Sequence, residues 1–309
     1  MTAVRTVRGD VDPAALGVCD SHDHLFLASP LLPGQELDDP AAAEAELRAF
    51  AAAGGRAVVQ WTPYGMGRGA ADLAGLSRDT GVHLVAATGL HQARHYEPDV
   101  LAALSDVDAL ARLFVEELTS GLREAGPRGG APVAVRAGMI KVAGGYHDLD
   151  EHARRVMTAA AAAHHATGAP IGVHHELGTG APEVLALLCG ELGVPPARVI
   201  LGHLNRFPDL RMHRQLAESG AFLALDGPSR ANHATDHRLL DVLAALVDAG
   251  HAGQLLLGGD TTTRAARGAP GLPHLVGGLA ARITREFGAG LTERLLVTNP
   301  ARAFAADWA

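Results

Sequence analysis

The chain is predicted to fold as a single α/β domain, a (β/α)8 TIM barrel that spans residues 1–309. Short apolar runs alternate with longer amphipathic segments along the whole sequence, which indicates a parallel sheet. Eight such pairs are present, the number that closes a barrel. No composition shift or linker divides the chain. An open doubly wound sheet is the alternative, but no G-x-G-x-x-G turn follows the first strand, which weakens its dinucleotide-binding form.

The predicted strands are short apolar runs bounded by Gly, Pro or polar clusters, and several are rich in β-branched residues. This composition is typical of parallel strands that are buried on both faces. In chain order they cover residues 16–22, 56–61, 83–88, 137–142, 169–174, 198–203, 221–226 and 254–260.

The predicted helices are amphipathic segments that follow each strand. Many begin with Asp, Pro, Ser or Thr and stop before a glycine, as helix caps require. They cover residues 40–53, 70–80, 106–125, 150–167, 182–192, 209–219, 236–249 and 272–287.

Composition excludes several classes of protein. Hydrophobic residues make up 48% of the chain and charged residues 19%, which is enough for a sizeable core. The net charge is −8, and we find no basic run of the kind that a nucleic-acid binder concentrates. No apolar stretch approaches a membrane span, the N-terminus lacks a signal-peptide core, and two cysteines make no disulfide framework. We therefore expect a soluble cytoplasmic protein without nucleic-acid or membrane partners.

Side chains that can bind a metal or be activated gather where five of the eight predicted strands end. They are His22 and His24 after the first strand, Lys141 in the fourth, His174 and His175 in the fifth, His203 in the sixth and Asp260 in the eighth. Because the active site of a (β/α)8 barrel lies at the carboxyl ends of its strands, these groups are expected to share one rim. The sequence therefore predicts a metal site there.

The spacing of these residues carries chemical information. His22 and His24 are two apart, so both imidazoles face one way in a strand and can bind one metal at roughly 2.0–2.1 Å. His174 and His175 must point to opposite faces, and alternation alone does not choose between them. An ammonium cannot bind a metal, but burial of Lys141 would free its amine. A carbamate that bridges two cations, a Schiff-base lysine and a simple ion pair all stay open for Lys141.

Several motifs together resemble the phosphotriesterase family of the amidohydrolase superfamily, over nearly the whole chain. His22-Asp23-His24-Leu25 is similar to the family's H-E-H-L opening, with Asp at the place of the usual Glu. The other matching segments are Val85-Ala86-Ala87-Thr88-Gly89, Gly138-Met139-Ile140-Lys141-Val142, the G-x-P-x-x-x-H pattern from Gly168 to His174, Ile200-Leu201-Gly202-His203 and Asn299-Pro300-Ala301-Arg302.

This resemblance implies a binuclear site, commonly of zinc, with Co²⁺, Mn²⁺ or Fe²⁺ able to substitute. His22, His24 and Asp260 would hold the buried metal, His174 and His203 the outer one, and carboxylated Lys141 would bridge both. The two cations would activate a bridging hydroxide for attack, and Asp260 would accept its proton. Homodimers are common in the family, so a dimer is an expectation as well.

The sequence indicates less about the substrate than about the metal site. Trp61, His91, Tyr96 and Arg230 follow strands and are predicted to contact it, with Arg230 suited to an anionic or carbonyl oxygen. Simple loop packing is the alternative for each. The segment after the eighth strand is short before a helix begins near Gly271, and aromatic residues make up 4%. These features favour a small lactone or carboxylic ester over a bulky organophosphate, with slow phosphotriesterase activity.

Three alternatives are kept open. A phosphotriester could be the main substrate instead. A TatD-like metal-dependent nuclease shares H-x-H, His, His and Asp, but usually carries Glu where this chain has Lys141. A non-catalytic binding barrel is the third. The helical histidines His152, His164, His165 and His213 are expected on the surface.

Overall fold

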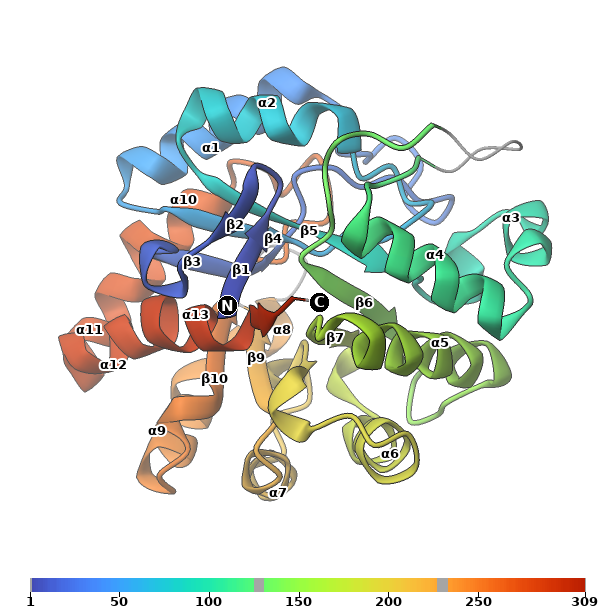
Figure 1. The fold of residues 1–309 in the computed structure, drawn as a ribbon. Coiled ribbons are helices and arrows are strands. Elements are labelled where there is room, and N and C mark those ends of the chain that lie inside the picture. The colour runs from blue at the N-terminus through green and yellow to red at the C-terminus, as the bar shows by residue number, and fades with distance from the viewer. Residues whose placement is uncertain (1, 125–130, 227–232, 309) are drawn as a thin grey trace.

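The computed structural model describes residues 2–124, 131–226 and 233–308. Eight parallel strands run side by side in chain order, from β3 (Cys19–Asp23) to β10 (Leu255–Gly258). Figure 1 shows them as a ring with the helices outside it. The two edge strands meet where Asp260 N, just after β10, donates to His22 O in β3 at 2.9 Å. The predicted (β/α)8 barrel is confirmed.

Each predicted strand overlaps an observed one, and the bounds differ by a few residues at the ends. Between the two edge strands lie β4 (Ala57–Gln60), β5 (His83–Gly89), β6 (Met139–Ala143), β7 (Ile171–His174), β8 (Val199–Leu201) and β9 (Phe222–Asp226). Strand β8 is half as long as predicted and ends before His203. That residue has a left-handed backbone, with φ of 63°, and so lies outside the regular strand.

The helices of the outer layer also follow the prediction. They are α1 (Pro40–Ala52), α2 (Ala70–Thr80), α4 (Val107–Thr119), α5 (Glu151–Thr167), α6 (Ala181–Leu185), α7 (Leu210–Glu218), α9 (Leu239–Asp248) and α11 (Ala280–Phe287). Asp side chains cap α1, α4, α5 and α7 by accepting from backbone N–H groups of the first turn. Short helices α3 (Pro98–Ala103), α8 (His233–Asp236), α10 (Leu272–His274), α12 (Ala289–Glu293) and α13 (Asn299–Ala303) complete the α-helices of the described residues. Segments of π-helix continue α6 (Ala186–Glu191), join α10 to α11 (Leu275–Leu279) and join α12 to α13 (Arg294–Thr298).

A small antiparallel sheet, which the sequence did not predict, lies over the amino ends of the barrel strands. β1 (Thr2–Thr6) pairs with β2 (Gly9–Val11) and with β11 (Ala305–Asp307). Val7 N donates to Leu84 O of β5 at 2.8 Å, which fixes the sheet against the barrel. The sheet brings both ends of the chain together on the face opposite the carboxyl ends of the strands (Figure 1).

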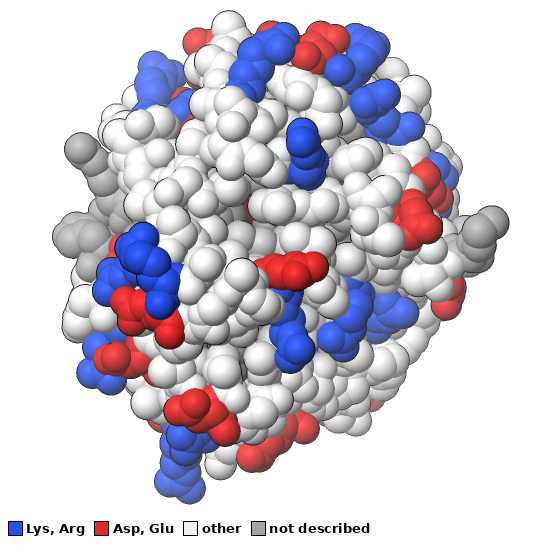
Figure 2. Space-filling model, turned by 90° about the vertical axis from the view of Figure 1, so that its left-hand side faces the viewer, with Lys and Arg blue, Asp and Glu red and all other residues white. Residues whose placement is uncertain are grey.

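Two apolar clusters hold the barrel together. The smaller one fills its interior with side chains such as Val59, Trp61, Met139 and Ile200. The larger one lies between the outer faces of the strands and the helices. No helix among the described residues is long and apolar enough to cross a membrane. Figure 2 shows basic and acidic side chains interspersed on the face that it presents.

Candidate metal centre

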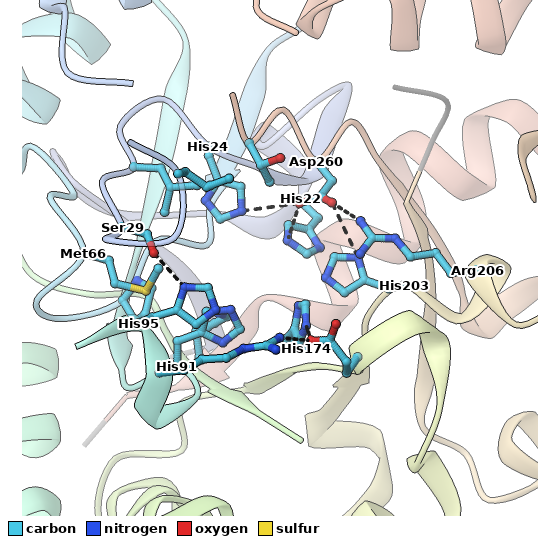
Figure 3. Close-up of a pocket in the computed structure, with 17 residues that line it drawn as sticks. His22, His24, Ser29, Met66, His91, His95, His174, His203, Arg206 and Asp260 are labelled. Carbon is cyan, nitrogen blue, oxygen red and sulfur yellow. Dashed lines mark hydrogen bonds and ion pairs between the residues drawn. The ribbon is translucent and has the colours of Figure 1, made fainter. Parts of the chain in front are cut away.

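The six predicted ligands line one cavity of about 240 Å³ at the carboxyl ends of the strands. They are His22, His24, Lys141, His174, His203 and Asp260, and all except His174 are buried. The Nε2 atoms of His22 and His24 lie 3.5 and 3.4 Å from Asp260 Oδ1. Figure 3 shows the imidazoles arranged around one shared space. The structure therefore brings the predicted set together.

Asp226, at the end of β9, orients two of the imidazoles. One carboxylate oxygen lies 3.0 Å from His22 Nδ1 and the other 2.5 Å from His203 Nδ1. Each ring therefore keeps Nε2 for another partner, as in the carboxylate–histidine pairs that support metal ligands. The sequence analysis gave Asp226 no role in the site. Its position at the end of a predicted strand, like that of the other site residues, was the available signal.

Thr62 fixes the protonation of His24. The Thr62 hydroxyl donates its single proton to Phe26 O at 2.5 Å and lies 2.7 Å from His24 Nδ1. Because that proton is already used, His24 Nδ1 must be the donor to Thr62. The lone pair of His24 is then on Nε2, the atom that faces Asp260.

Asp260 is held in place by the residues on either side of it. Gly259 N donates to Asp20 Oδ1 at 3.1 Å, and Thr261 N donates to Asp23 Oδ1 at 2.9 Å. Asp260 itself has a left-handed backbone with φ of 51°, a costly conformation that these bonds maintain. Gly259 is required here, since a Cβ atom would lie 2.2 Å from an oxygen of Asp23. The acidic residue inside the H-x-H motif thus helps to close the barrel.

Burial determines the charge state of the histidines. It lowers the pKa of His24 to about 4 and that of His174 to about 3. Burial also holds the pKa of His203 well below its usual range. These three imidazoles are therefore neutral near pH 7, and neutral imidazole is the form that binds a metal.

Lys141 and Asp260 respond differently to the same environment. Burial lowers the pKa of Lys141 to about 7, against the opposing effect of Asp260. Burial alone would raise the pKa of Asp260, but the neighbouring side chains, Arg206 first among them, together outweigh burial and hold that pKa well below its usual range. Arg206 contacts Asp260 directly through Nη2. The site thus contains an amine that is partly neutral at pH 7 beside an ionised carboxylate.

The structure also resolves the choice on β7. His174 lines the cavity, whereas His175 is fully buried elsewhere, with Nδ1 3.0 Å from Thr179 O. The neighbouring Glu176 lies 3.4 Å from His174 Nε2 and lines the cavity too. Sequence reasoning passed over Glu176 and Arg206, which follow the strand-end histidines by two and three positions.

Two residues that are predicted to contact the substrate lie outside the lining of the cavity. Trp61 has no exposed surface: its ring stacks on His22 at 3.8 Å and its Nε1 donates to Ser21 O. A Cβ on Gly172 would come within 2.8 Å of that ring, so Trp61 is the floor of the site. Tyr96 is buried, and its hydroxyl accepts from His91 N at 2.7 Å. Neither residue lines the cavity, because one is packed beneath it and the other supports a loop.

Of the remaining predictions, His91 does line the cavity, and Arg230 lies outside the described residues. Two helical histidines are not on the surface as expected. His164 is buried with Nδ1 2.7 Å from Ala169 O, and His213 is fully buried on α7. Their helices carry these side chains on the inner face.

The lining of the cavity mixes apolar and polar groups. Its apolar members are Leu27, Leu32, Pro63 and Met66. Its polar or charged members include His91, Arg94, His95, Glu176 and Arg206. Figure 3 shows His91 and His95 next to His174, with Ser29 and Met66 beyond His95. The cavity therefore offers a small ligand both apolar and polar contacts.

Comparison with known proteins agrees with this geometry. The sequence model described as the phosphotriesterase family matches residues 2–304. A phospho-furanose lactonase of Mycoplasmopsis agalactiae is 32% identical over 250 residues, which cover 77% of this chain and 70% of the relative. The solved structure of a lactonase from Listeria monocytogenes superposes with a TM-score of 0.86 at 28% identity, over 98% of both chains. An organophosphorus hydrolase from Deinococcus radiodurans gives a TM-score of 0.84 at 28% identity, over 98% of this chain and 96% of that one.

Proposed function

The chain belongs to the phosphotriesterase family of hydrolases, and we propose that it hydrolyses a lactone or carboxylic ester at a two-metal site. The observation that carries this proposal is the approach of three potential ligand atoms. The Nε2 atoms of His22 and His24 both lie within 3.5 Å of Asp260 Oδ1. Two imidazole nitrogens beside one buried carboxylate oxygen suit a divalent cation, to which each atom would bind at roughly 2.0–2.2 Å.

The residues present fit the group that the family implies. Ligand atoms of His22, His203 and Asp260 lie within 4.8 Å of one another. The imidazoles of His24, His174 and His203 are neutral and the Asp260 carboxylate is ionised, which are the forms that bind zinc or a related cation. We assign the buried metal to His22, His24 and Asp260, and the outer metal to His174 and His203. When bound, the cations would polarise the bond to be broken and lower the pKa of a water between them.

Lys141 would join the two metal positions after reaction with CO2. Its neutral Nζ attacks the carbon of CO2, an N–C bond forms as a C–O π bond breaks, and a proton passes to solvent. The product is a carbamate with two oxygens. The pKa of about 7 keeps part of Lys141 in the reactive amine form near neutral pH.

Asp260 would accept the proton released in the reaction, and Arg206 would keep Asp260 ionised. Asp260 Oδ1 faces the two histidines of the H-x-H motif, whereas Oδ2 contacts Arg206 and lies 3.7 Å from His203 Nδ1. We assign transient proton acceptance to Oδ2, because Oδ1 would bind the metal. Arg206 keeps this carboxylate ionised between turnovers.

Cavity size supports a small substrate. The cavity measures about 240 Å³, and α10 begins at Leu272 after a short loop from β10, as the sequence predicts. A phosphotriester is the second candidate, favoured by the resemblance to an organophosphorus hydrolase. The same site chemistry can act at phosphorus or at a carbonyl carbon.

A substrate panel tests the proposal. Metal-replete protein is assayed for kcat/KM on ribono-1,4-lactone, phenyl acetate and diethyl p-nitrophenyl phosphate, with His24→Ala as the inactive variant and His165→Ala as the exposed control. We expect the lactone or the ester to be the best substrate. A higher kcat/KM for the phosphotriester would reverse the order, and cleavage of DNA with Mg²⁺ would favour a nuclease. Hydrolysis by the metal-replete wild type that does not exceed that of Lys141→Ala or the buffer on any substrate would favour a binding barrel.

A further inference from the structure

His95 is a histidine of the catalytic cavity to which the proposed reaction gives no role. It ends a short 3₁₀ helix (Ala93–His95) in the loop after β5, and its side chain is half-buried. Its Nδ1 lies 2.9 Å from Oγ of Ser29, which belongs to the loop after β3. Both residues line the cavity. Because His95 is outside the proposed set of metal ligands, its ring can contact a substrate instead.

The contacts of Ser29 decide which nitrogen of His95 carries the proton. Burial lowers the pKa of His95 to about 4, so the ring is neutral near pH 7 and has one N–H group. Ser29 is buried, and its Oγ accepts from Leu31 N at 3.2 Å. Among the described residues its hydroxyl proton finds one acceptor, His95 Nδ1. His95 must therefore carry its own proton on Nε2.

The Nε2–H group of His95 is accessible from the cavity. It makes no hydrogen bond to a described residue, and it is not one of the buried polar atoms that lack a partner. His91 stacks on the face of the His95 ring with centroids 4.3 Å apart, which leaves the ring edge uncovered. Figure 3 shows Ser29 and His174 on opposite sides of His95. Since the two nitrogens of an imidazole point in nearly opposite directions, Nε2 is directed away from Ser29 and into the cavity.

Asp260 lies across the cavity from His95 (Figure 3). In the proposed reaction Asp260 accepts the proton of the attacking water, so the new bond to the carbonyl carbon forms on that side. The bond to the leaving oxygen points away from the incoming one. From this arrangement we propose that His95 Nε2–H donates a hydrogen bond to the leaving-group oxygen as the ester or lactone C–O bond breaks. This role rests on the proposed function and adds a catalytic residue to it.

The hydrogen bond would stabilise the negative charge that develops on the leaving oxygen. The electron pair of the C–O bond passes to that oxygen, and the proton that Asp260 accepted from water neutralises it. His95 keeps its own proton, because the N–H of a neutral imidazole is a weak acid. Loss of one preorganised donor of this kind costs roughly 10²–10³-fold in kcat. The cost should be largest for a basic leaving oxygen, on which the charge is most localised.

A series of substituted phenyl acetates tests this role. The p-nitro, p-chloro, unsubstituted and p-methoxy esters share one acyl group but differ in the basicity of the leaving oxygen. We compare kcat/KM for the metal-replete wild type and His95→Ala, with ribono-1,4-lactone as the most basic leaving group. The loss in His95→Ala is expected to rise from less than about threefold for the p-nitro ester to about 10²-fold for the lactone.

Two variants serve as controls. Gln places an amide N–H near the position of Nε2, so His95→Gln is expected to recover part of the activity on the lactone. His165→Ala removes an exposed histidine and should behave as the wild type on every ester. If His95 had only a structural role, its loss would lower kcat/KM by the same factor for all of these substrates. An equal factor across the series therefore overturns the proposal.

Nitrogen NMR tests the proton assignment without turnover. In protein labelled in its histidine rings, the chemical shifts distinguish protonated from unprotonated nitrogens, and the signals that His95→Gln removes belong to His95. We expect a protonated Nε2 and an unprotonated Nδ1 near pH 7, and a mixture of the two neutral forms in Ser29→Ala. A proton on Nδ1 in the wild type overturns the proposal.

The two proposals fail separately. Absence of hydrolysis by the wild type on every ester and lactone would overturn the proposed reaction together with the leaving-group role, even if the NMR spectrum places the proton on Nε2. Hydrolysis by the wild type with an equal loss across the series, or with the proton on Nδ1, would overturn the role of His95 alone.

Discussion

The two sides of the catalytic cavity are built differently. On the side of β3, β8, β9 and β10, the side chains are buried and each is held by a named partner, as Asp226 holds His22 and His203. On the side of the loops after β5 and β7, Arg94 and Glu176 are partly exposed and meet in one ion pair. We call these the fixed side and the open side. The difference indicates that the reaction chemistry is preset, whereas recognition uses contacts that a ligand can exchange.

The backbone shows the same contrast. On the fixed side, His203 and Asp260 have left-handed φ angles of 63° and 51°. Such conformations cost free energy and persist where surrounding bonds determine them. For Asp260 those bonds come from Asp20, His22 and Asp23 on the neighbouring strand. Substitutions on the fixed side should therefore affect catalysis, metal binding and stability, and substitutions on the open side should affect selectivity.

The largest effect is expected from Asp260→Ala. Loss of a residue that we propose both binds a metal and accepts a proton should reduce kcat/KM on the best substrate by roughly 10²–10⁴-fold. Asp248→Ala, an exposed carboxylate at the end of α9, is the control and should change little. An Asp260→Ala activity within threefold of the wild type would contradict the role of the fixed side.

Trp61→Ala tests the floor of the fixed side. Removing a fully buried indole should lower the free energy of unfolding by about 3–5 kcal/mol, measured by urea denaturation. Trp308→Ala is the comparison, since Trp308 is half-buried and packs near the end of the chain against Arg5. If Trp61→Ala lowered the free energy of unfolding no more than Trp308→Ala does, packing of the Trp61 ring beneath the site would not be needed for stability.

Asp226→Asn tests orientation without removing a ligand. An amide is a poorer acceptor for the Nδ1–H groups of His22 and His203, so zinc affinity should fall about 10–100-fold. Competition with a chromophoric chelator measures the affinity, and Asp248→Asn provides the control. Unchanged zinc affinity in Asp226→Asn would show that His22 and His203 keep their orientation without Asp226.

The smallest effect is expected on the open side. Arg94→Ala breaks an ion pair that is largely accessible to water, so the free energy of unfolding should change by less than about 1 kcal/mol. Urea denaturation measures it beside Arg48→Ala, the matched control, because Arg48 is 56% exposed and pairs with Glu44 at 2.6 Å on α1. A loss above about 2 kcal/mol, which exceeds the range for exposed pairs, would mean that the open side is as rigid as the fixed side.

Local sequence pattern predicted most of the barrel because strand and helix periodicity are local properties. It missed the pairing of β1 with β11, since Val4 and Ala305 are about 300 residues apart and neither strand exceeds five residues. The strand-end ligands were readable because parallel strands bring their carboxyl ends together. Trp61 was predicted to contact the substrate, whereas its backbone N–H donates to Asp23 O and continues the pairing of β4 with β3.

The residues that contact and orient other site residues could not be predicted from the sequence in the same way. Asp226 orients His22 across the barrel, and the two are 204 positions apart, so no spacing rule connects them. Arg94 and Glu176 meet only because the loops after β5 and β7 approach each other. Such pairs follow from tertiary geometry and not from a motif.

Metal stoichiometry tests the central claim most directly. Protein expressed with excess zinc is dialysed and its metal measured by elemental analysis per chain, before and after chelation, with lactone hydrolysis followed in parallel. We predict about two divalent ions per chain, loss of hydrolysis on chelation and its return when zinc is restored. Fewer than about one ion per chain, or hydrolysis that persists without metal, would contradict the two-metal site.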